Sequence, residues 1–282
     1  MGKKLADLLA GGPVVMGVLN VTPDSFSDGG RFQAVDDALA RADGMIADGA
    51  AIIDIGGEST RPGAEPVATE EELARVMPVI RALRAAHPET WISIDTMKAP
   101  VMRAAAEAGA DLINDVHALQ GPGALAAARE TALPVCLMHM QGEPRTMQRN
   151  PCYGDVVGEV AGWLSERVAG CMAAGISAEA ILVDPGIGFG KKLEHNLALL
   201  AHLDRFRGLA AGLLIGVSRK SMFAQLLDLP VDQRLAPGLS AAAVAVWQGA
   251  DIIRSHDVFE TAQAVRTAAA LRGARQTGEA PQ

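Results

Sequence analysis

Residues 14–30 read VVMGVLNVTPDSFSDGG, and this stretch sets a pattern that the rest of the chain repeats. The apolar run from Val14 to Leu19 predicts a buried strand that ends at Asn20. A polar loop follows, in which Phe26 is the one aromatic side chain. Loops directly after buried strands often carry binding and catalytic residues, although this composition also suits a plain strand-to-helix connection.

Seven more short apolar runs follow, and segments with helical spacing separate them. The eight predicted strands are Val14–Leu19, Ala51–Ile55, Trp91–Ile94, Asp111–Asn114, Pro134–Met138, Ile181–Val183, Leu213–Val217 and Asp251–Ile253. The predicted helices are Val35–Ala47, Glu71–Ala86, Pro100–Ala108, Pro122–Thr131, Asp155–Ala174, Glu194–Leu203, Ala241–Gln248 and Val258–Leu271. The strands are continuously apolar rather than alternating, which is typical of a parallel sheet covered by helices.

Repeated strand–helix units predict an α/β fold, a single-domain (β/α)8 TIM barrel. We expect the barrel to occupy residues 1–272 and the polar tail 273–282 to be disordered. A doubly wound open sheet is the alternative, but its first strand would usually lead into a Gly-rich turn, and here that turn is Asn-Val-Thr-Pro-Asp. The spacing of Thr69 and Glu72 also predicts a capping box at the start of the second helix.

Composition and charge exclude several classes of protein. Of the 282 residues 49% are apolar, the net charge is −8, and no run of Lys or Arg exceeds two residues, which argues against nucleic-acid binding. The three cysteines, Cys136, Cys152 and Cys171, have no CxxC spacing and predict neither a disulfide framework nor a zinc site. We find no signal-peptide core or membrane-spanning run and expect a soluble, cytoplasmic protein.

Every predicted strand ends in polar or ionisable residues. In a (β/α)8 barrel these ends meet at one mouth, where active sites form. In chain order the mouth would receive Asn20, Asp54 with residues 56–63, Asp95, Asn114, His139, Asp184, residues 218–221, Arg254 and His256. A single Asp or Asn at such a place is often a helix cap, but capping alone does not explain polar residues after all eight strands.

These side chains fall into two chemical sets. Asp95, Asn114 and Asp184 suit a flat heterocycle rich in N–H donors, because buried carboxylates need such partners. Four potential cations suit phosphate or pyrophosphate: Arg61, Lys220, Arg254 and His256. Asn20 offers a neutral oxygen that would complete a Mg²⁺ shell shared with phosphate oxygens. The alternative is that the cations form salt bridges with the acids across the mouth.

The glycine-rich stretch 186–191, GIGFGK, resembles a phosphate-binding loop. Its spacing is not the GxxxxGK[ST] that cradles nucleotide phosphates. We therefore interpret it as a strand-to-helix turn that presents Phe189 to the pocket.

In these residues the chain resembles the dihydropteroate synthase family, and the resemblance extends from about Val14 to Val265. The matching segments are Gly17–Gly30 (GVLNVTPDSFSDGG), Asp54–Gly63 (DIGGESTRPG), Trp91–Thr96 (WISIDT), Ile113–Val116 (INDV), Leu137–Gln141 (LMHMQ), Asp184–Lys191 (DPGIGFGK), Ser218–Ser221 (SRKS) and Ile253–Val258 (IRSHDV). The resemblance implies condensation of 6-hydroxymethyl-7,8-dihydropterin pyrophosphate with p-aminobenzoate, which gives 7,8-dihydropteroate and pyrophosphate. It also implies a homodimer and an enzyme of the class that sulfonamides target, while the sensitivity of this chain to sulfonamides cannot be told from the sequence.

The resemblance implies roles for residues at matching positions. Pterin-binding residues would be Asp95, Asn114, Val116, Met138, Asp184, Phe189, Lys220 and Arg254. Pyrophosphate would be held by Asn20, Thr60, Arg61, Arg254 and His256, with Mg²⁺ on Asn20. The p-aminobenzoate slot would be formed by Phe26, Pro62, Lys220 and Ser221. The catalytic set would be Asp95, Asp184, Lys220, Arg61 and His256.

The predicted mechanism is early cleavage of the C–O bond, before the second substrate attacks. Positive charge would spread into the pterin ring and be stabilised by Asp95 and Asp184, while Arg61 and His256 would stabilise the departing pyrophosphate. The arylamine is already neutral at pH 7, so a strong general base is unnecessary. Three other functions stay open: a pterin-dependent methyltransferase, a non-catalytic pterin-binding paralogue, and a Schiff-base aldolase built on Lys220.

Overall fold

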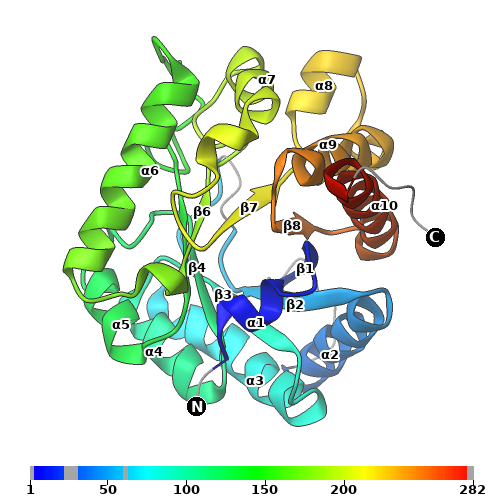
Figure 1. Cartoon of the computed structure of the whole chain (residues 1–282). Helices are drawn as coiled ribbons and strands as arrows, with labels where there is room; N and C mark the ends of the chain where they lie inside the picture. The colour runs from blue at the N-terminus through cyan, green and yellow to red at the C-terminus, as the bar shows by residue number, and fades with distance from the viewer. Residues whose placement is uncertain (1–2, 22–30, 60–62, 278–282) are drawn as a thin grey trace.

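The computed structural model of this chain describes residues 3–21, 31–59 and 63–277. Eight parallel strands in these ranges close into one barrel in sequential order, with helices on the outside (Figure 1). The strands are β1 Val14–Asn20, β2 Ala50–Gly56, β3 Trp91–Asp95, β4 Leu112–Asp115, β5 Val135–Met138, β6 Ile181–Asp184, β7 Gly212–Gly216 and β8 Ile252–Ser255. The predicted (β/α)8 barrel is confirmed, and each strand lies within two residues of its predicted bounds.

The helices follow the strands as expected of the fold. They are α1 Leu5–Leu9, α2 Arg31–Ala47, α3 Thr69–Ala86, α4 Ala99–Ala108, α5 Ala124–Thr131, α6 Val156–Ala173, α7 Leu193–Ala201, α8 Met222–Leu227, α9 Leu235–Gln248 and α10 Val258–Thr277. Short 3-10 turns lie at Ala178–Ala180, Leu203–Phe206 and Val231–Gln233. In the described part of the chain, no helix combines the length and apolar character needed to cross a bilayer.

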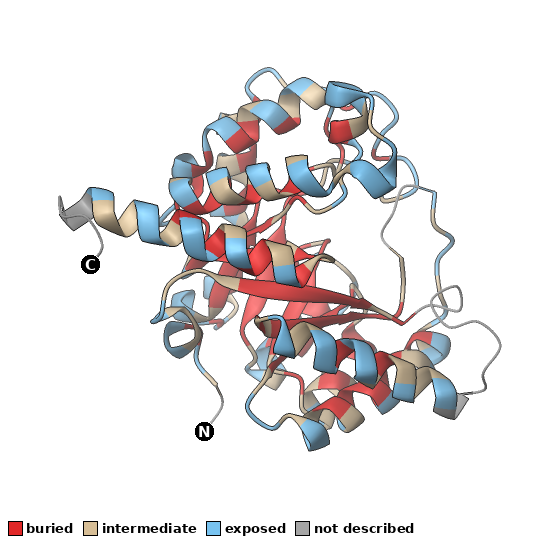
Figure 2. Ribbon diagram, turned by 90° about the vertical axis from the view of Figure 1, so that its right-hand side faces the viewer, coloured by how far each residue is buried: buried red, intermediate tan, exposed pale blue. Residues whose placement is uncertain are grey.

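The barrel closes where β8 pairs with β1, with Val14 opposite Ile252 and Met16 opposite Arg254. Buried residues run along the strands and the inner faces of the surrounding helices (Figure 2). The larger apolar cluster fills the layer between the strands and those helices. The fold therefore buries each strand on both sides, which explains why the strands lack an alternating pattern.

A second, smaller cluster fills the inside of the barrel at the amino ends of the strands. Its buried members are Leu5, Met16, Ile52, Trp91, Leu112, Cys136, Leu182, Leu214 and Ile252. Side chains two residues apart on a strand share a face, so the next inward positions after Ile52, Leu112, Leu182 and Ile252 are Asp54, Asn114, Asp184 and Arg254. An apolar floor thus lies directly beneath a polar layer supplied by the four even-numbered strands.

Three helices differ from the sequence-based expectations. Helix α1 was not predicted, and its Leu5 packs into the barrel floor. Helix α9 begins at Leu235, six residues before the predicted Ala241, because a proline at position 237 is tolerated in the first turn. Helix α8 was also not predicted; it has only six residues, too few for a clear helical repeat.

The ends of two further helices also differ. The Thr69–Glu72 capping box does not form, since the N-cap of α3 is Ala68 and makes no side-chain cap. Helix α10 continues to Thr277, past the boundary expected at 272, because Arg272 donates to the Val246 carbonyl oxygen at 2.7 Å and thereby fastens its last turns to α9. Residues 278–282 lie outside the described ranges, so the disorder expected there stays a prediction.

We expect Leu5→Ala to lower the free energy of unfolding by about 2–5 kcal/mol, because the side chain is buried in the barrel floor and leaves a cavity. Urea unfolding followed by circular dichroism measures the change. Asp7→Asn, an exposed position on the same helix, is the matched control. A change below about 0.5 kcal/mol for Leu5→Ala would show that α1 does not close the floor.

Candidate functional site

A network of ion pairs and hydrogen bonds crosses the centre of the barrel mouth and joins four strands. Arg254 on β8 donates from Nε to Asp54 Oδ2 on β2 at 2.6 Å and from Nη2 to Asp95 Oδ2 on β3 at 2.8 Å. Asn114 on β4 donates from Nδ2 to the same Asp54 oxygen at 3.1 Å. The alternative interpretation of the cations, salt bridging to the acids, therefore describes Arg254.

Burial controls the electrostatics of this network. The side chain of Asp54 is fully buried, and its Oδ1 has no hydrogen-bond partner among the described residues. Burial raises the pKa of Asp95 to about 7; the Arg254 charge opposes this shift, and the carboxylates of Asp54 and Asp115 reinforce it. The neighbouring carboxylates raise the pKa of Arg254 despite its burial, so the guanidinium stays charged. The mouth thus holds a buried carboxylate oxygen, Asp54 Oδ1, whose capacity to accept an N–H donor is unused among the described residues.

Asp184 at the end of β6 supplies the second acidic position. Its Oδ1 accepts from the Gly186 N–H at 2.7 Å, and burial raises the pKa of this carboxyl although that hydrogen bond opposes the shift. The charge of Lys220 acts on Asp184, and burial lowers the pKa of Lys220 to about 8. The Lys220 Nζ lies 4.4 Å from the centre of the Phe189 ring. Asp184, Phe189 and Lys220, all predicted site residues, therefore lie around one part of the mouth.

The glycine-rich turn after β6 is a closely packed connection. Gly186, Gly188 and Gly190 all have positive φ angles. A Cβ on Gly186 would lie 2.0 Å from the His139 carbonyl oxygen, and one on Gly190 would lie 2.3 Å from the Gln141 carbonyl oxygen. Only glycine permits this approach to the loop after β5, and that approach sets where Phe189 lies.

A buried lysine fastens the same turn to β5. Lys191 is 3% exposed, and its Nζ lies 3.0 Å from His139 Nδ1 and donates to the Phe189 carbonyl oxygen at 2.9 Å. Burial lowers the pKa of Lys191 to about 7, with Asp184 opposing the shift. Burial, aided by the Lys191 charge, lowers the pKa of His139 to about 3. Lys191 therefore links the two strand ends that carry Met138 and Asp184.

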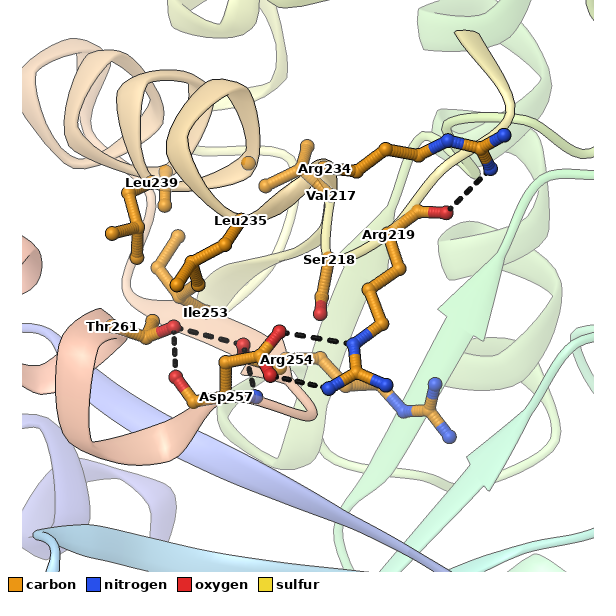
Figure 3. Close-up of a pocket in the computed structure, with 13 residues that line it drawn as sticks. Val217, Ser218, Arg219, Arg234, Leu235, Leu239, Ile253, Arg254, Asp257 and Thr261 are labelled. Carbon is orange, nitrogen blue, oxygen red and sulfur yellow. Dashed lines mark hydrogen bonds and ion pairs between the residues drawn. The ribbon is translucent and has the colours of Figure 1, made fainter. Parts of the chain in front are cut away.

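The other predicted cations have different partners. Ser218 Oγ lies 3.1 Å from His256 Nδ1, and the His256 backbone N–H donates to the same hydroxyl at 3.2 Å. Arg219, to which no role was assigned, forms a two-pronged ion pair with Asp257. These contacts surround a small pocket between β7, β8, α9 and α10 (Figure 3). Ser221 is exposed and precedes α8.

Asn20 ends β1 next to Gly56, the last residue of β2. A Cβ built on Gly56 would lie 3.8 Å from Asn20 Oδ1 and 3.7 Å from Asp95 Oδ2, so the glycine leaves a small space bounded by two oxygens. Mg²⁺ that keeps waters and phosphate oxygens needs only one or two protein oxygens. The donors present therefore fit such an ion, although the described residues contain no cluster of three acidic, histidine or cysteine ligands.

The remaining predicted residues are placed as follows. Val116 and Met138 are buried at the ends of β4 and β5. Phe26, Thr60, Arg61 and Pro62 lie outside the described residues, so their roles stay predictions. The structure thus brings Asp95, Asn114 and Arg254 into one network, places Asp184, Phe189 and Lys220 around another part of the mouth, and joins His256 to Ser218.

Comparison with known proteins gives one consistent answer. A family model described as pterin binding enzyme matches residues 16–256. The dihydropteroate synthase of Escherichia coli (strain K12) is 54% identical over 264 residues, which cover 94% of this chain and 93% of that protein. The chain belongs to the dihydropteroate synthases of the pterin-binding family.

Solved structures agree with this assignment. The Yersinia pestis dihydropteroate synthase, in a sulfonamide drug complex, matches with a TM-score of 0.87 and 52% identity over 93% of this chain and 94% of that one. The Burkholderia cenocepacia dihydropteroate synthase, complexed with 7,8-dihydropteroate, matches with a TM-score of 0.84 and 48% identity over 94% of this chain and 93% of that one. The family expected from the sequence motifs is confirmed, and the chain is a transferase of folate biosynthesis.

Sequence reasoning missed several residues that shape the site. Asp54 was noted only as a strand end, yet it accepts two side-chain hydrogen bonds at the centre of the mouth. Lys98 was not noted; it pairs with Glu58, two residues after β2, and with Glu72 in the first turn of α3. Thr96 also donates to Glu72, at 2.6 Å, so this carboxylate is not available as a helix cap. The feature that these residues share is a charged side chain in a buried or partly buried position. The sequence does not show which individual charged residues are buried, so it could not single them out.

Lys191 predicts a dependence of stability on pH. Its pKa is about 7 when folded and 10.5 ordinarily, so between these values the unfolded chain binds a proton that the folded chain lacks. The free energy of unfolding should therefore rise with pH over this window. We expect Lys191→Met to make the slope between pH 7 and 9 less positive in urea titrations, with Lys220 supplying the remainder. Lys192→Met, at the exposed neighbour, should keep the slope; equal slopes for Lys191→Met and wild type would refute the assignment.

Proposed function

We propose that this barrel mouth joins 6-hydroxymethyl-7,8-dihydropterin pyrophosphate to p-aminobenzoate and releases pyrophosphate. The observation that carries the proposal is the set of buried polar side chains above the apolar floor: Asp95 and Asn114 are linked through Arg254 and Asp54, and Asp184 acts electrostatically on the same Arg254. Buried oxygens of this kind suit the N–H donors of a flat pterin ring, since neither partner is then left unpaired. Val116, Met138 and Phe189 would supply apolar walls.

Arg254 has two places in this proposal. Its guanidinium plane would stack on the pterin ring while its charge faces the pyrophosphate, together with His256 and with Thr60 and Arg61. Asn20 would hold Mg²⁺ against the pyrophosphate oxygens, and the ion would supply charge neutralisation on the leaving group. The space between Asn20, Gly56 and Asp95 supports this position.

The second substrate would enter beside Lys220 and Ser221, with Phe26 and Pro62 completing its slot. A groove of about 440 Å³ opens next to Ser221, lined also by Gln148, Lys192 and Gln225. The bound dihydropteroate of the Burkholderia cenocepacia enzyme, whose chain is 48% identical, supports a site that holds both halves of the product. A carboxylate on the aromatic ring would meet the Lys220 charge and remain near solvent.

We propose that the C–O bond of the pterin substrate breaks first. Asp95 and Asp184 would stabilise positive charge in the ring, and each well-placed electrostatic contact of this kind is typically worth about 10²–10³ in rate. Arg254 and His256 would balance charge on the leaving pyrophosphate. The neutral arylamine nitrogen then forms the new C–N bond and loses its proton. Exclusion of water from the mouth would prevent capture of the cation.

The assembly and location are also proposals. Exposed apolar side chains gather on α9 and α10, where Val244, Trp247, Phe259 and Leu271 are each more than two-fifths exposed. This apolar surface supports the expected homodimer. The free thiols of Cys136 and Cys171, both buried in the apolar core, support the reducing cytosol as the compartment.

A pyrophosphate-release assay tests the reaction. We expect release with both substrates and Mg²⁺, and slower release with the pterin substrate alone, because C–O cleavage precedes attack. A methyltransferase or a non-catalytic pterin-binding protein would release no pyrophosphate under any of these conditions. Release that strictly requires p-aminobenzoate would refute early cleavage while leaving the overall reaction intact.

We expect Asp184→Asn to weaken binding of a pterin analogue by about 100-fold, since an amide offers the ring one acceptor and one misplaced donor in a buried site. Isothermal titration calorimetry measures the affinity, and Asp232→Asn, at an exposed position, is the control. An unchanged affinity for Asp184→Asn would remove this residue from the pterin site.

Phe26→Ala should raise the KM for p-aminobenzoate about 10-fold and leave pterin-analogue affinity within twofold, because an aromatic wall contributes apolar contact to one substrate only. Steady-state kinetics at saturating pterin substrate, with calorimetry alongside, separates the two effects. If pterin affinity falls and the KM for p-aminobenzoate does not change, the proposed division of the two subsites is wrong.

A further inference from the structure

Two turns at the barrel mouth are tied together by an ion pair between Arg219 and Asp257, neither of which the proposed reaction uses. One turn, residues 217–221, leads from β7 to α8 and carries Lys220 and Ser221. The other, residues 256–257, leads from β8 to α10 and carries His256. Figure 3 shows Arg219 reaching from the first turn to Asp257 in the second.

The ion pair between the turns has a defined geometry. Arg219 Nε donates to Asp257 Oδ2 at 3.1 Å, and Nη2 donates to Oδ1, so both carboxylate oxygens are engaged by one guanidinium. The hydrogen bond from Arg219 is the main cause that lowers the pKa of Asp257 below its ordinary value. Thr261 Oγ1 donates to the Asp257 carbonyl oxygen at 2.6 Å, which fixes the acidic residue at the start of α10.

The backbone at Arg219 needs this support. Its φ angle is +57°, a left-handed conformation that residues other than glycine rarely adopt. Arg234 Nη1 donates to the Arg219 carbonyl oxygen at 3.3 Å, and Arg234 Nε donates to the Leu229 carbonyl oxygen at 3.0 Å, so the chain before α9 also holds the turn. A left-handed residue directly before Lys220 sets the direction in which Lys220 and Ser221 leave the strand.

A second contact joins the same turns one residue earlier. Ser218 Oγ is in hydrogen-bond contact with both Nδ1 and the backbone N–H of His256, which fixes the position of the imidazole ring. The small cavity beside these bridges measures about 10 Å³ and is lined by Ser218, Arg219, Asp257 and Arg254 among others. That volume accommodates one water molecule at most, so the cavity is a packed joint rather than a ligand pocket.

We propose that Arg219 and Asp257 form a latch that positions Lys220 and Ser221 relative to His256, and so sets how p-aminobenzoate meets the carbon that carries the pyrophosphate. Neither latch residue contacts substrate; both are positioning residues. The inference rests on the proposed function, because it assigns the two turns to the second substrate and to the leaving group. The pterin contacts of Asp95, Asn114 and Asp184 come from other strands and do not depend on the latch.

The pair is half exposed on the arginine side, with 49% of the Arg219 side chain and 20% of the Asp257 side chain accessible. Exposed ion pairs contribute little to global stability, so removing this one should not unfold the barrel. The ion pair instead contributes to the geometry of the two turns, because two parallel hydrogen bonds fix the orientation of both side chains. A positioning role therefore predicts a changed KM for p-aminobenzoate with an unchanged free energy of unfolding, whereas a structural role predicts that both change.

The test uses two single variants, Asp257→Ala and Arg219→Gly. A double variant that carries Arg219→Asp together with Asp257→Arg reverses the charges of the ion pair. Arg219→Gly accepts the positive φ without strain, so it removes the ion pair and the backbone cost together. We expect the KM for p-aminobenzoate to rise about 10-fold in both single variants, while the affinity for a pterin analogue stays within twofold. The charge reversal should reverse at least half of this rise in KM on a logarithmic scale.

Circular dichroism and urea unfolding check that each variant is folded, and Asp232→Ala is the exposed control. Arg219→Lys keeps the charge without the fork and should give an intermediate KM. Unchanged KM for p-aminobenzoate in both single variants, or equal loss of both substrates, would overturn the latch. If wild type released no pyrophosphate in the presence of both substrates, the proposed function would fail instead, and the two failures are therefore distinguishable.

Discussion

The salt bridge from Arg254 to Asp54 and Asp95 is the constraint on which the barrel mouth depends. It joins β8 to β2 and β3, strands separated by 200 and 159 residues in the chain. A charge buried in such a place is costly unless it is paired, and removal of one partner leaves the others uncompensated. The network therefore requires the barrel to be closed and in register before its charges can be satisfied, and this couples the fold directly to the electrostatics of the site.

The same register explains how one chain supplies both a stable core and a polar mouth. On each even-numbered strand an inward apolar residue is followed, two positions later, by an inward polar one: Ile52 by Asp54, and Leu112 by Asn114. Asp95 on β3 is buried at the same mouth, and this burial raises its pKa. Site chemistry is thus a consequence of where the apolar floor ends, because the same carboxylate nearer to solvent would keep its ordinary pKa.

Much of this arrangement could be predicted from the sequence, for a clear physical reason. Continuous apolar runs define parallel strands, and the polar residue after each run marks the mouth, so Asp95, Asn114 and Asp184 were identifiable without coordinates. Partners were not. Glu72 has the spacing of a helix-capping residue, but Thr96 and Lys98 engage it instead. Lys191 and Lys220 look alike in the sequence, and only tertiary packing makes one a buried link and the other a neighbour of Phe189.

The geometry of Arg254 bears on how the mouth would bind the proposed charged substrate without breaking its own network. Nε contacts Asp54 and Nη2 contacts Asp95, so the two carboxylates are held by different nitrogens. Asp54 is fully buried and also engages Asn114, whereas Asp95 remains 9% exposed. In the proposed binding mode, a ring donor that reaches Asp95 would replace Nη2 while Nε stays on Asp54, and the freed N–H groups of Nη2 would become available to the ligand. An isolated Asp95–Arg254 pair would lose its arginine in that exchange, so the second carboxylate is what keeps the cation in place.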